Sequence, residues 1–316
     1  LIRLNGADNV TIDGSNSGGS DRSLTIANTN TFGSGIWLSS LGIGAGASYN
    51  TIKNCNITTG VAATTNYGIG IGGQSLGSAG ADNDNITIQN NSISNAASAV
   101  FAVGMTGAPV GGFDSLKILN NRIFHNSTYN GNVMGMQLSN VVNAVVSLDT
   151  IDLQSLSTGT LIGIALESGA INALVDRNYI SKCLTTATST VGAKGINIGT
   201  GMANSNITVS NNVITNVNGA TNTSIPTSTS IGIGLGLVST VNSITGGVNL
   251  LHNSVSMTGS IGTFSNSQTY ALYVSSSALN LNLRNNIFSN TQSATQTAQK
   301  NYAVYNAGTA AVFTTM

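Results

Sequence analysis

The sequence predicts an all-β fold, a right-handed parallel β-helix (β-solenoid) of about nine rungs with three strands per rung. A short alternating pattern that contains an Asn pair recurs along the chain. A Gly-led apolar strand lies between successive copies of it. The composition agrees, because 41% of residues are hydrophobic, Gly is abundant (38), Pro is scarce (2) and the polar residues are mainly Asn, Ser and Thr.

The clearest copy of the first pattern is residues 85–94. In extended backbone Ile86, Ile88 and Ile93 point one way, and the polar residues between them point the other. The Asn pair suits a tight bend, because Asn tolerates the left-handed conformation of a corner. Other copies lie at 50–57, 116–123, 207–214, 248–255 and 281–288, with degenerate copies at 10–14, 146–151 and 175–180. The copies are spaced by about 34 residues on average, and the period of two inside each copy argues against a helical repeat.

The Gly-led strand is the second repeating element. It occurs at residues 35–38, 68–71, 135–138, 163–166, 195–198 and 232–235, and in looser form at 100–103, 271–274 and 303–305. One rung is therefore a strand, an Asn corner, a short strand and a Gly-led strand. The connecting loops vary in length, and a solenoid usually places its binding surface on such loops. They lie at 14–21, 41–47, 72–84, 106–112, 185–192, 219–229 and 259–268.

A column of Asn side chains is expected at the corners. The predicted ladder consists of Asn54, Asn90, Asn120, Asn211 and Asn285. Each amide donates to the next, which fixes the register between rungs, because a buried amide without a partner costs about 1–3 kcal/mol. Leu148, Arg177 and His252 interrupt the column, and we expect irregular rungs there.

Charge excludes several classes of partner. Only 6% of residues are charged and the formal net charge is zero, so nucleic acid and anionic membrane surfaces lack their main attraction. No apolar run of about 18 residues is present, so membrane insertion is not expected. Cys55 and Cys183 should lie about 19 Å apart, too far for a disulfide.

We expect residues 1–316 to form a single parallel β-helix domain. The chain starts inside a repeat and shows no capping element at either end. Because solenoid ends normally need caps, we interpret the sequence as a segment of a longer chain.

Three sequence segments resemble a known family: residues 4–14, 50–57 and 301–309. They are similar to segments of the large secreted right-handed parallel β-helix repeat proteins of Bacteroidota, which are adhesin-like surface proteins associated with type IX secretion. The likeness covers essentially the whole chain. It implies the fold and an extracellular or cell-surface location, and it supplies no catalytic motif.

Polysaccharide lyases and glycoside hydrolases also use this fold, and they need convergent carboxylates or a base. The densest ionisable group is Arg122, His125, Asp149, Asp152, Asp176, Arg177 and Lys182. Aligned on the repeat, His125 and Lys182 fall in one column. We favour charges that replace Asn at irregular corners and pair with one another. No catalytic residue is therefore predicted, and a carbohydrate-active β-helix is kept as the alternative function.

Few residues suggest a ligand. Asp82 and Asp84 offer oxygen ligands for Ca²⁺ but lack the spacing of a defined Ca²⁺ loop, so an Asx-rich turn is favoured and no cofactor is predicted. Trp37, Tyr273 and Tyr305 occupy outward positions of Gly-led strands. They are candidates for carbohydrate contact, although stacking on neighbouring loops is the more ordinary role.

The sequence thus favours a non-catalytic structural or adhesin-like β-helix located outside the cell, acting as a surface stalk, filament or adhesion segment. The expected partners are extracellular glycans or cell-surface molecules. Self-association, end to end or laterally, is a further expectation.

Overall fold

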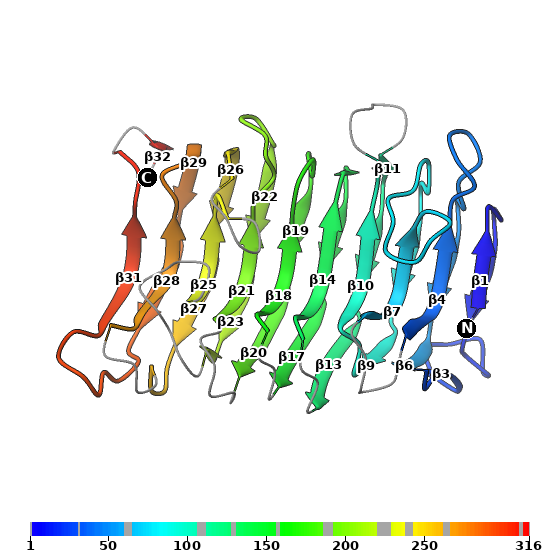
Figure 1. Ribbon diagram of the computed structural model, residues 1–316, viewed down its shortest axis with the longest axis horizontal. Helices are drawn as coiled ribbons and strands as arrows, with labels where there is room; N and C mark the ends of the chain where they lie inside the picture. The colour runs from blue at the N-terminus through cyan, green and yellow to red at the C-terminus, as the bar shows by residue number, and fades with distance from the viewer. Residues whose placement is uncertain are drawn as a thin grey trace.

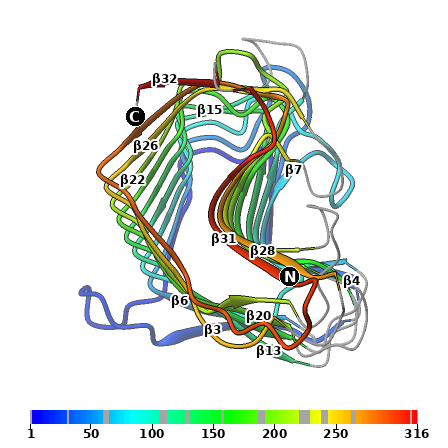
Figure 2. The same cartoon turned by 90° about the vertical axis from the view of Figure 1, so that its left-hand side faces the viewer.

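The computed structural model is a solenoid of parallel β-strands (Figures 1 and 2). It describes residues 2–30, 32–59, 65–105, 112–127, 131–155, 159–185, 192–219, 229–237, 243–261, 266–309 and 312–315. The variable loops expected at 106–112, 185–192, 219–229 and 259–268 lie wholly or partly outside the described residues. Within those residues every named element is a β-strand, and the predicted parallel β-helix is confirmed.

The first sheet contains the Gly-led strands. Its order is β1 (Ile2–Asn5), β4 (Phe32–Ser39), β7 (Thr65–Gly72), β10 (Ser98–Val103), β14 (Val133–Ser139), β18 (Leu161–Leu166), β21 (Ala193–Ile198), β25 (Ser230–Leu235), β28 (Gln268–Val274) and β31 (Lys300–Asn306).

The second sheet contains the strand before each Asn corner. Its order is β2 (Thr11–Asp13), β5 (Thr51–Lys53), β8 (Thr87–Gln89), β12 (Lys117–Leu119), β16 (Val145–Ser147), β19 (Leu174–Asp176), β22 (Ile207–Ser210), β26 (Thr245–Leu251), β29 (Ala278–Arg284) and β32 (Phe313–Thr315). A small extra sheet pairs β11 (Phe113–Asp114) with β15 (Val141–Val142).

The third sheet contains the strand after each corner. Its order is β3 (Leu24–Asn28), β6 (Cys55–Thr59), β9 (Ser92–Ser94), β13 (Arg122–Ser127), β17 (Thr150–Ser155), β20 (Tyr179–Thr185), β23 (Val213–Thr215), β27 (Ser254–Met257) and β30 (Ile287–Asn290), with β24 (Val217–Asn218) also paired to β20. One strand from each sheet makes a turn, as the sequence predicted.

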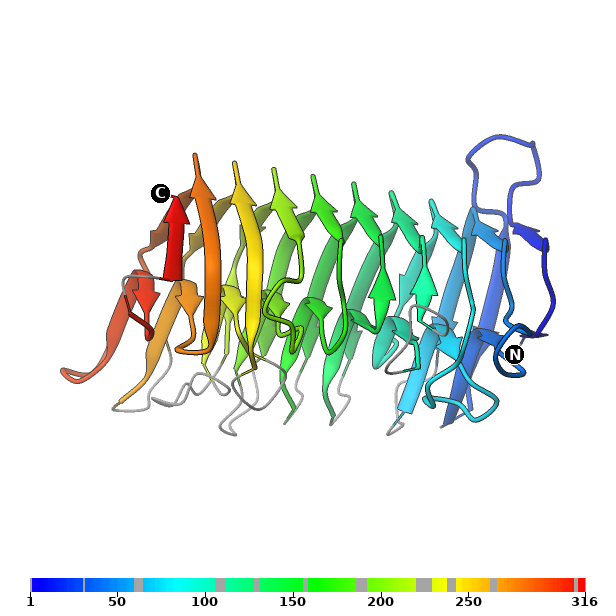
Figure 3. The same cartoon turned by 90° about the horizontal axis from the view of Figure 1, so that it is seen from above.

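Equivalent residues of successive turns pair directly. Equivalent strands of successive turns lie side by side along the axis (Figure 3). Ile52 of β5 pairs with Ile12 of β2 and Ile88 of β8, so these residues form one column. Seen from the C-terminal end, the chain winds counter-clockwise toward the viewer, which makes the solenoid right-handed (Figure 2).

The core is made of such apolar columns. The inward column of the second sheet is fully buried at Ile52, Ile88, Ile118, Val146, Val175, Val209 and Leu250. The first sheet bows toward this interior (Figure 2). A Cβ on Gly68 would lie 2.4 Å from Ile93 Cγ2, and one on Gly232 would lie 2.4 Å from Val255 Cγ1. Gly therefore leads the strands of the first sheet because side chains of the third sheet occupy the space beside them.

The corners explain the Asn pairs. The first residue of each corner has a left-handed backbone, with φ of 58° at Asn54, 51° at Asn90 and 54° at Asn120. Leu148, Arg177 and His252 adopt the same conformation, with φ of 63°, 54° and 57°. These three residues therefore keep the bend that Asn makes elsewhere.

The continuous buried column of polar side chains lies one residue after the predicted ladder. Its members are the buried Asn91, Asn121, Asp149, Asn178, Asn212 and Asn253 and the half-buried Asn286. In the predicted column, Asn90 Nδ2 donates to Asn54 Oδ1 (2.7 Å) and Asn120 Nδ2 reaches Asn90 Oδ1 at 3.5 Å, but Asn211 Nδ2 bonds to Asp176. At Asn120 and Asn211 the corner side chain is exposed, whereas the side chain of the next residue, Asn121 or Asn212, is buried.

Candidate functional site

A second polar column runs along the corner that leads into the second sheet. Its members are Asn85, Ser115, Asn143, Asn172, Asn206, Gly247 and Asn280, all with φ between 51° and 69°. Asn is favoured there because its short amide tolerates the left-handed conformation. Unlike the buried column, this one presents its amides to solvent, since Asn143, Asn206 and Asn280 are exposed.

Gly247 interrupts this exposed column. On one side of it, Asn206 donates from Nδ2 to Asn172 Oδ1 at 3.0 Å. Gly247 has no side chain to continue the column, and the next amide belongs to Asn280. Two rung spacings, about 10 Å, therefore separate the positions of Asn206 and Asn280.

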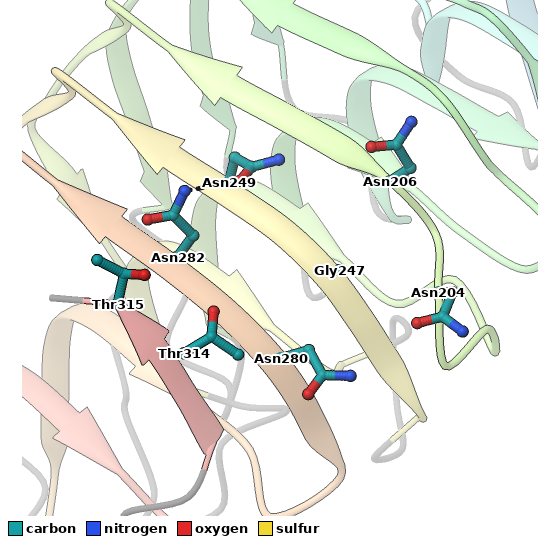
Figure 4. A pocket seen from close by; sticks show the side chains of 8 residues that line it. All are labelled: Asn204, Asn206, Gly247, Asn249, Asn280, Asn282, Thr314 and Thr315. Carbon is teal, nitrogen blue, oxygen red and sulfur yellow. Dashed lines mark hydrogen bonds between the residues drawn. The ribbon is translucent and has the colours of Figure 1, made fainter.

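The missing side chain leaves a groove. It has a volume of about 350 Å³. Its lining residues come from the last four rungs and are Asn204, Asn206, Gly247, Asn249, Asn280, Asn282, Thr314 and Thr315 (Figure 4). All eight residues are uncharged, so the groove is a neutral surface rich in amides and hydroxyls.

Hydrogen bonds fix one side of the groove and leave the other open. Asn282 Nδ2 donates to Asn249 Oδ1 at 2.9 Å, and Arg284 Nε donates to Asn282 Oδ1 at 3.1 Å. Both amides are therefore held in one orientation. Within the described residues, the side-chain amides of Asn204 and Asn280 make no hydrogen bond. The groove thus combines oriented amides with others that are free to bind a ligand.

The predicted carbohydrate-contact residues share one outward column of the first sheet. Trp37 pairs with Gly70 near one end, and Tyr273 pairs with Tyr305 near the other. Trp37 is 8% exposed, and the Arg3 guanidinium carbon lies 3.9 Å from the centroid of its ring. Trp37 lies near one end of the solenoid, and Tyr273 and Tyr305 lie together near the other. The three residues therefore do not form one site, and sugar contact at each end stays a separate prediction.

A tyrosine cluster surrounds the last two of these residues. Tyr273 stacks on Tyr305 with ring centroids 5.7 Å apart, and Tyr270 stacks on Tyr302 at 5.4 Å. Burial, followed by the neighbouring phenols, raises the pKa of the Tyr270 hydroxyl above its ordinary value. The rings thus pack on one another across β28 and β31 and not on neighbouring loops.

The ionisable group predicted around the fourth to sixth rungs does not converge. His125 is 2% exposed, and burial lowers its pKa to about 4. Lys182 instead pairs with Asp152, with Nζ and Oδ1 3.5 Å apart, because a register shift after Ile151 moves it out of the column of His125. The prediction that His125 and Lys182 share a column was therefore wrong.

Asp176, Arg177 and Arg122 lie apart from that pair. Asp176 accepts hydrogen bonds from Ser210 Oγ, Asn211 Nδ2 and the adjacent Arg177. The guanidinium of Arg122 lies over the ring of Phe124. The Asp176–Arg177 contact is a local charge pair of the kind expected, whereas Arg122 packs on an aromatic ring and not on a carboxylate.

Asp149 occupies the buried amide column. Its Oδ1 accepts from the backbone N–H and the side-chain amide of Asn121 at 2.6 and 2.9 Å. Its Oδ2 is buried and has no hydrogen-bond partner among the described residues. Burial raises the pKa of this carboxyl to about 8, despite the opposing hydrogen bonds from Asn121. The side chain is therefore suited to the neutral, protonated form.

Lys194 is a second buried ionisable group. It is fully buried, and its Nζ has no hydrogen-bond partner within the described part of the chain. Burial lowers its pKa to about 8, while the charge of Glu167 acts in the opposite direction. Glu167 accepts a hydrogen bond from Gln137 Nε2 at 2.9 Å. Because Lys194 is closed to solvent, it is a poor site for a soluble ligand.

The two aspartates proposed for Ca²⁺ engage backbone amides. Asp82 Oδ2 accepts from Gly44 N, and Asp84 Oδ1 accepts from Asp114 N at 2.8 Å. Burial raises the pKa of Asp84, and the charges of Asp114 and Asp82 raise it further. Among the described residues no group of three or more acidic, His or Cys side chains is arranged for a metal. Ca²⁺ binding there stays a prediction, as does the expectation of no cofactor.

Comparison with known proteins gives little beyond this geometry. No protein-family model and no curated protein matches the chain. One solved structure is similar: PfbA, a surface adhesin of Streptococcus pneumoniae, with 13% sequence identity and a TM-score of 0.49. The match covers 96% of this chain and 62% of that one. At this level it carries no functional argument, and the resemblance to Bacteroidota proteins and type IX secretion stays a prediction.

The sequence reasoning missed the groove. It recognised Asn249 and Asn282 only as parts of the repeat and did not consider Asn206, Gly247 or Asn280. A usable signal is present, because a polar residue stands two positions before the outward residue of each second-sheet strand, and Gly replaces it at 247.

The described residues contain no helix that could span a membrane.

Proposed function

We propose that this chain is a non-catalytic, extracellular β-helix that acts as an adhesin-like stalk or adhesion segment. The observation that carries the proposal is the unbroken stacking of all three sheets along the described chain. Equivalent strands pair in parallel from β1 to β31 in the first sheet and from β2 to β32 in the second.

Such a stack makes a stiff spacer. Backbone groups in each inner strand bond to the rungs on both sides, and the buried side-chain column adds bonds between rungs, such as Asn212 Nδ2 to Asn253 Oδ1 at 2.9 Å. A protease needs an extended, unpaired backbone, so paired strands protect the chain in an extracellular setting. The low charge leaves exposed amides and hydroxyls as the contact groups for extracellular glycans or cell-surface partners.

The ionisable residues argue against the alternative of a carbohydrate-active enzyme. A glycosidase needs two carboxyl groups that face each other across the scissile bond, at about 5–9.5 Å. Here Asp149 is buried inside the solenoid, Asp152 pairs with Lys182, and Asp176 is hydrogen bonded to Ser210 and Asn211. None of these carboxyl groups faces another across an open cleft in the described residues.

Beads coated with the purified chain test this function. The beads should bind to cell surfaces or immobilised extracellular polysaccharide, and the chain should resist proteolysis. Incubation with the same polysaccharides should release no new reducing ends or unsaturated sugars. Release of such products would establish the enzyme instead, and uncoated-bead levels of adhesion would overturn the adhesive role.

A further inference from the structure

We propose that the groove at Gly247 binds a neutral saccharide. This inference rests on the proposed function and gives it a contact site and a ligand class. The groove exists because one side chain is missing from the exposed amide column, between Asn206 and Asn280. A ligand that continues the hydrogen bonding of the column through this gap is the natural occupant.

The lining selects a ligand rich in hydroxyl groups. Each Asn amide carries two N–H donors and an acceptor oxygen, and each Thr hydroxyl both donates and accepts. A sugar hydroxyl likewise donates one hydrogen bond and accepts others, so either partner can satisfy the other. Five Asn and two Thr side chains line the groove together with Gly247.

Charge complementarity excludes an ionic ligand as the preferred occupant. None of the eight lining residues is ionisable. The nearby Arg284 directs its Nε to Asn282 Oδ1 at 3.1 Å, so this donor is already engaged by the groove wall. A uronate or phosphate would lose its hydration in the groove without meeting a charged side chain among the lining residues.

The groove also sets the expected affinity. Its 350 Å³ lies at the lower end of the roughly 300–1,000 Å³ of small-molecule sites, but its lining contains no aromatic ring on which a sugar could stack. Binding of the saccharide therefore replaces hydrogen bonds to water with hydrogen bonds to the groove, and each such exchange contributes little free energy. We expect a dissociation constant of about 1 mM for a single site.

Gly247→Asn is the sharpest test, because it rebuilds the amide that the column lacks. Asn adopts left-handed backbone at the equivalent positions 206 and 280, with φ of 51° and 53°, and Gly247 has φ of 69°. The new Cβ would lie 3.3 Å from Asn206 N, a close contact that needs only a small shift. The variant should fold, fill the groove and weaken binding at least tenfold.

Asn143→Gly is the matched control. It opens a gap in the same exposed column, away from the groove, at a residue with φ of 55°. The probes are chitotriose and cellotriose as neutral sugars and trigalacturonate as a charged one. The readout is the shift of Asn side-chain amide NMR signals during titration. The wild type and Asn143→Gly should show saturable shifts at Asn204 and Asn280 with a neutral probe, and Gly247→Asn should not.

Three results would overturn the saccharide site. They are the absence of saturable shifts with both neutral probes, equal binding by Gly247→Asn, and tighter binding of trigalacturonate. The bead assay separates this failure from failure of the proposed function. Adhesion by wild-type beads without sugar binding in the groove removes only the saccharide site, whereas loss of wild-type adhesion removes the function itself.

Discussion

The side-chain amide of Asn121 donates to Oδ1 of Asp149 on the next rung at 2.9 Å, inside a column otherwise continued by amides. The flanking amides also donate to a backbone carbonyl of an earlier rung: Asn121 Nδ2 to Ile88 O at 3.0 Å and Asn178 Nδ2 to Val146 O at 3.0 Å. An ionised Asp149 carboxylate has no hydrogen to donate to a backbone carbonyl in this way. A protonated Asp149 does, which fits the raised pKa of its carboxyl.

The protonated carboxyl predicts that stability falls as pH rises. The folded chain holds the Asp149 proton up to a pKa of about 8, whereas the unfolded chain releases it near the ordinary value of 3.8. The contribution to stability is therefore complete below the unfolded pKa and declines from there until the folded pKa is passed. We expect the melting temperature to drop across this window.

Asp149→Asn should remove most of that drop and raise stability at neutral pH by about 2–4 kcal/mol. Melting followed by circular dichroism at several pH values measures both effects. The reverse change, Asn178→Asp, should introduce a new decline with pH. If the wild type and Asp149→Asn show the same pH profile, Asp149 is not the protonated group.

Asn212 and Asn211 test which residue of the pair forms the buried column. Asn212 is fully buried and bonds through Nδ2 to Val175 O and Asn253 Oδ1, both at 2.9 Å. Asn212→Ala should destabilise the chain by about 2–4 kcal/mol, because it leaves buried partners unsatisfied. Asn211→Gly keeps the left-handed corner but removes the hydrogen bond to Asp176, so it should cost about 1 kcal/mol, less than Asn212→Ala. Equal losses in urea unfolding would contradict the assignment.

The repeat pattern was sufficient to predict the solenoid, but not the side-chain column within it. In Asn90–Asn91 and Asn120–Asn121 both residues are identical, so composition alone cannot say which one points inward. The informative rungs are the irregular ones. There the first position accepts Leu148 or His252, while the second keeps Asp149 or Asn253. In these two rungs, the position that keeps Asn or Asp while its neighbour varies is the one that carries the hydrogen-bonding constraint.

The failures at the site have two local causes. The register shift after Ile151 moved Lys182 out of the column of His125, and bulges of this kind leave no clear trace in a sequence of alternating residues. The groove depends on a side chain that is absent, at Gly247. Gly247 is one of 38 Gly residues in the chain, so it carries no signal until the corner column is known.

Gly68 tests the space beside the first sheet. Gly68→Ala would place a Cβ 2.4 Å from Ile93 Cγ2 and 2.6 Å from Ala99 O. Overpacking of this kind costs about 1–3 kcal/mol, so we expect a lower melting temperature. Gly19→Ala is the control, because its Cβ would contact only Ser17 Oγ at 3.2 Å. A Gly68→Ala variant as stable as Gly19→Ala would show that the first sheet can move outward.

The two cysteines can report how the stack opens. Cys55 and Cys183 are both fully buried and unpaired with each other, as the sequence predicted, and burial raises the pKa of both thiols. The folded chain should therefore react slowly with a thiol reagent.

Cys55 lies in β6, near one end of the stack of the third sheet, whereas Cys183 lies in β20, in its interior. Because each rung is held only by its neighbours, opening should start at an end, and Cys55 should be labelled first in mild denaturant. The variants Cys55→Ser and Cys183→Ser assign the two rates. Equal rates at every denaturant concentration would mean that the solenoid opens as one cooperative unit.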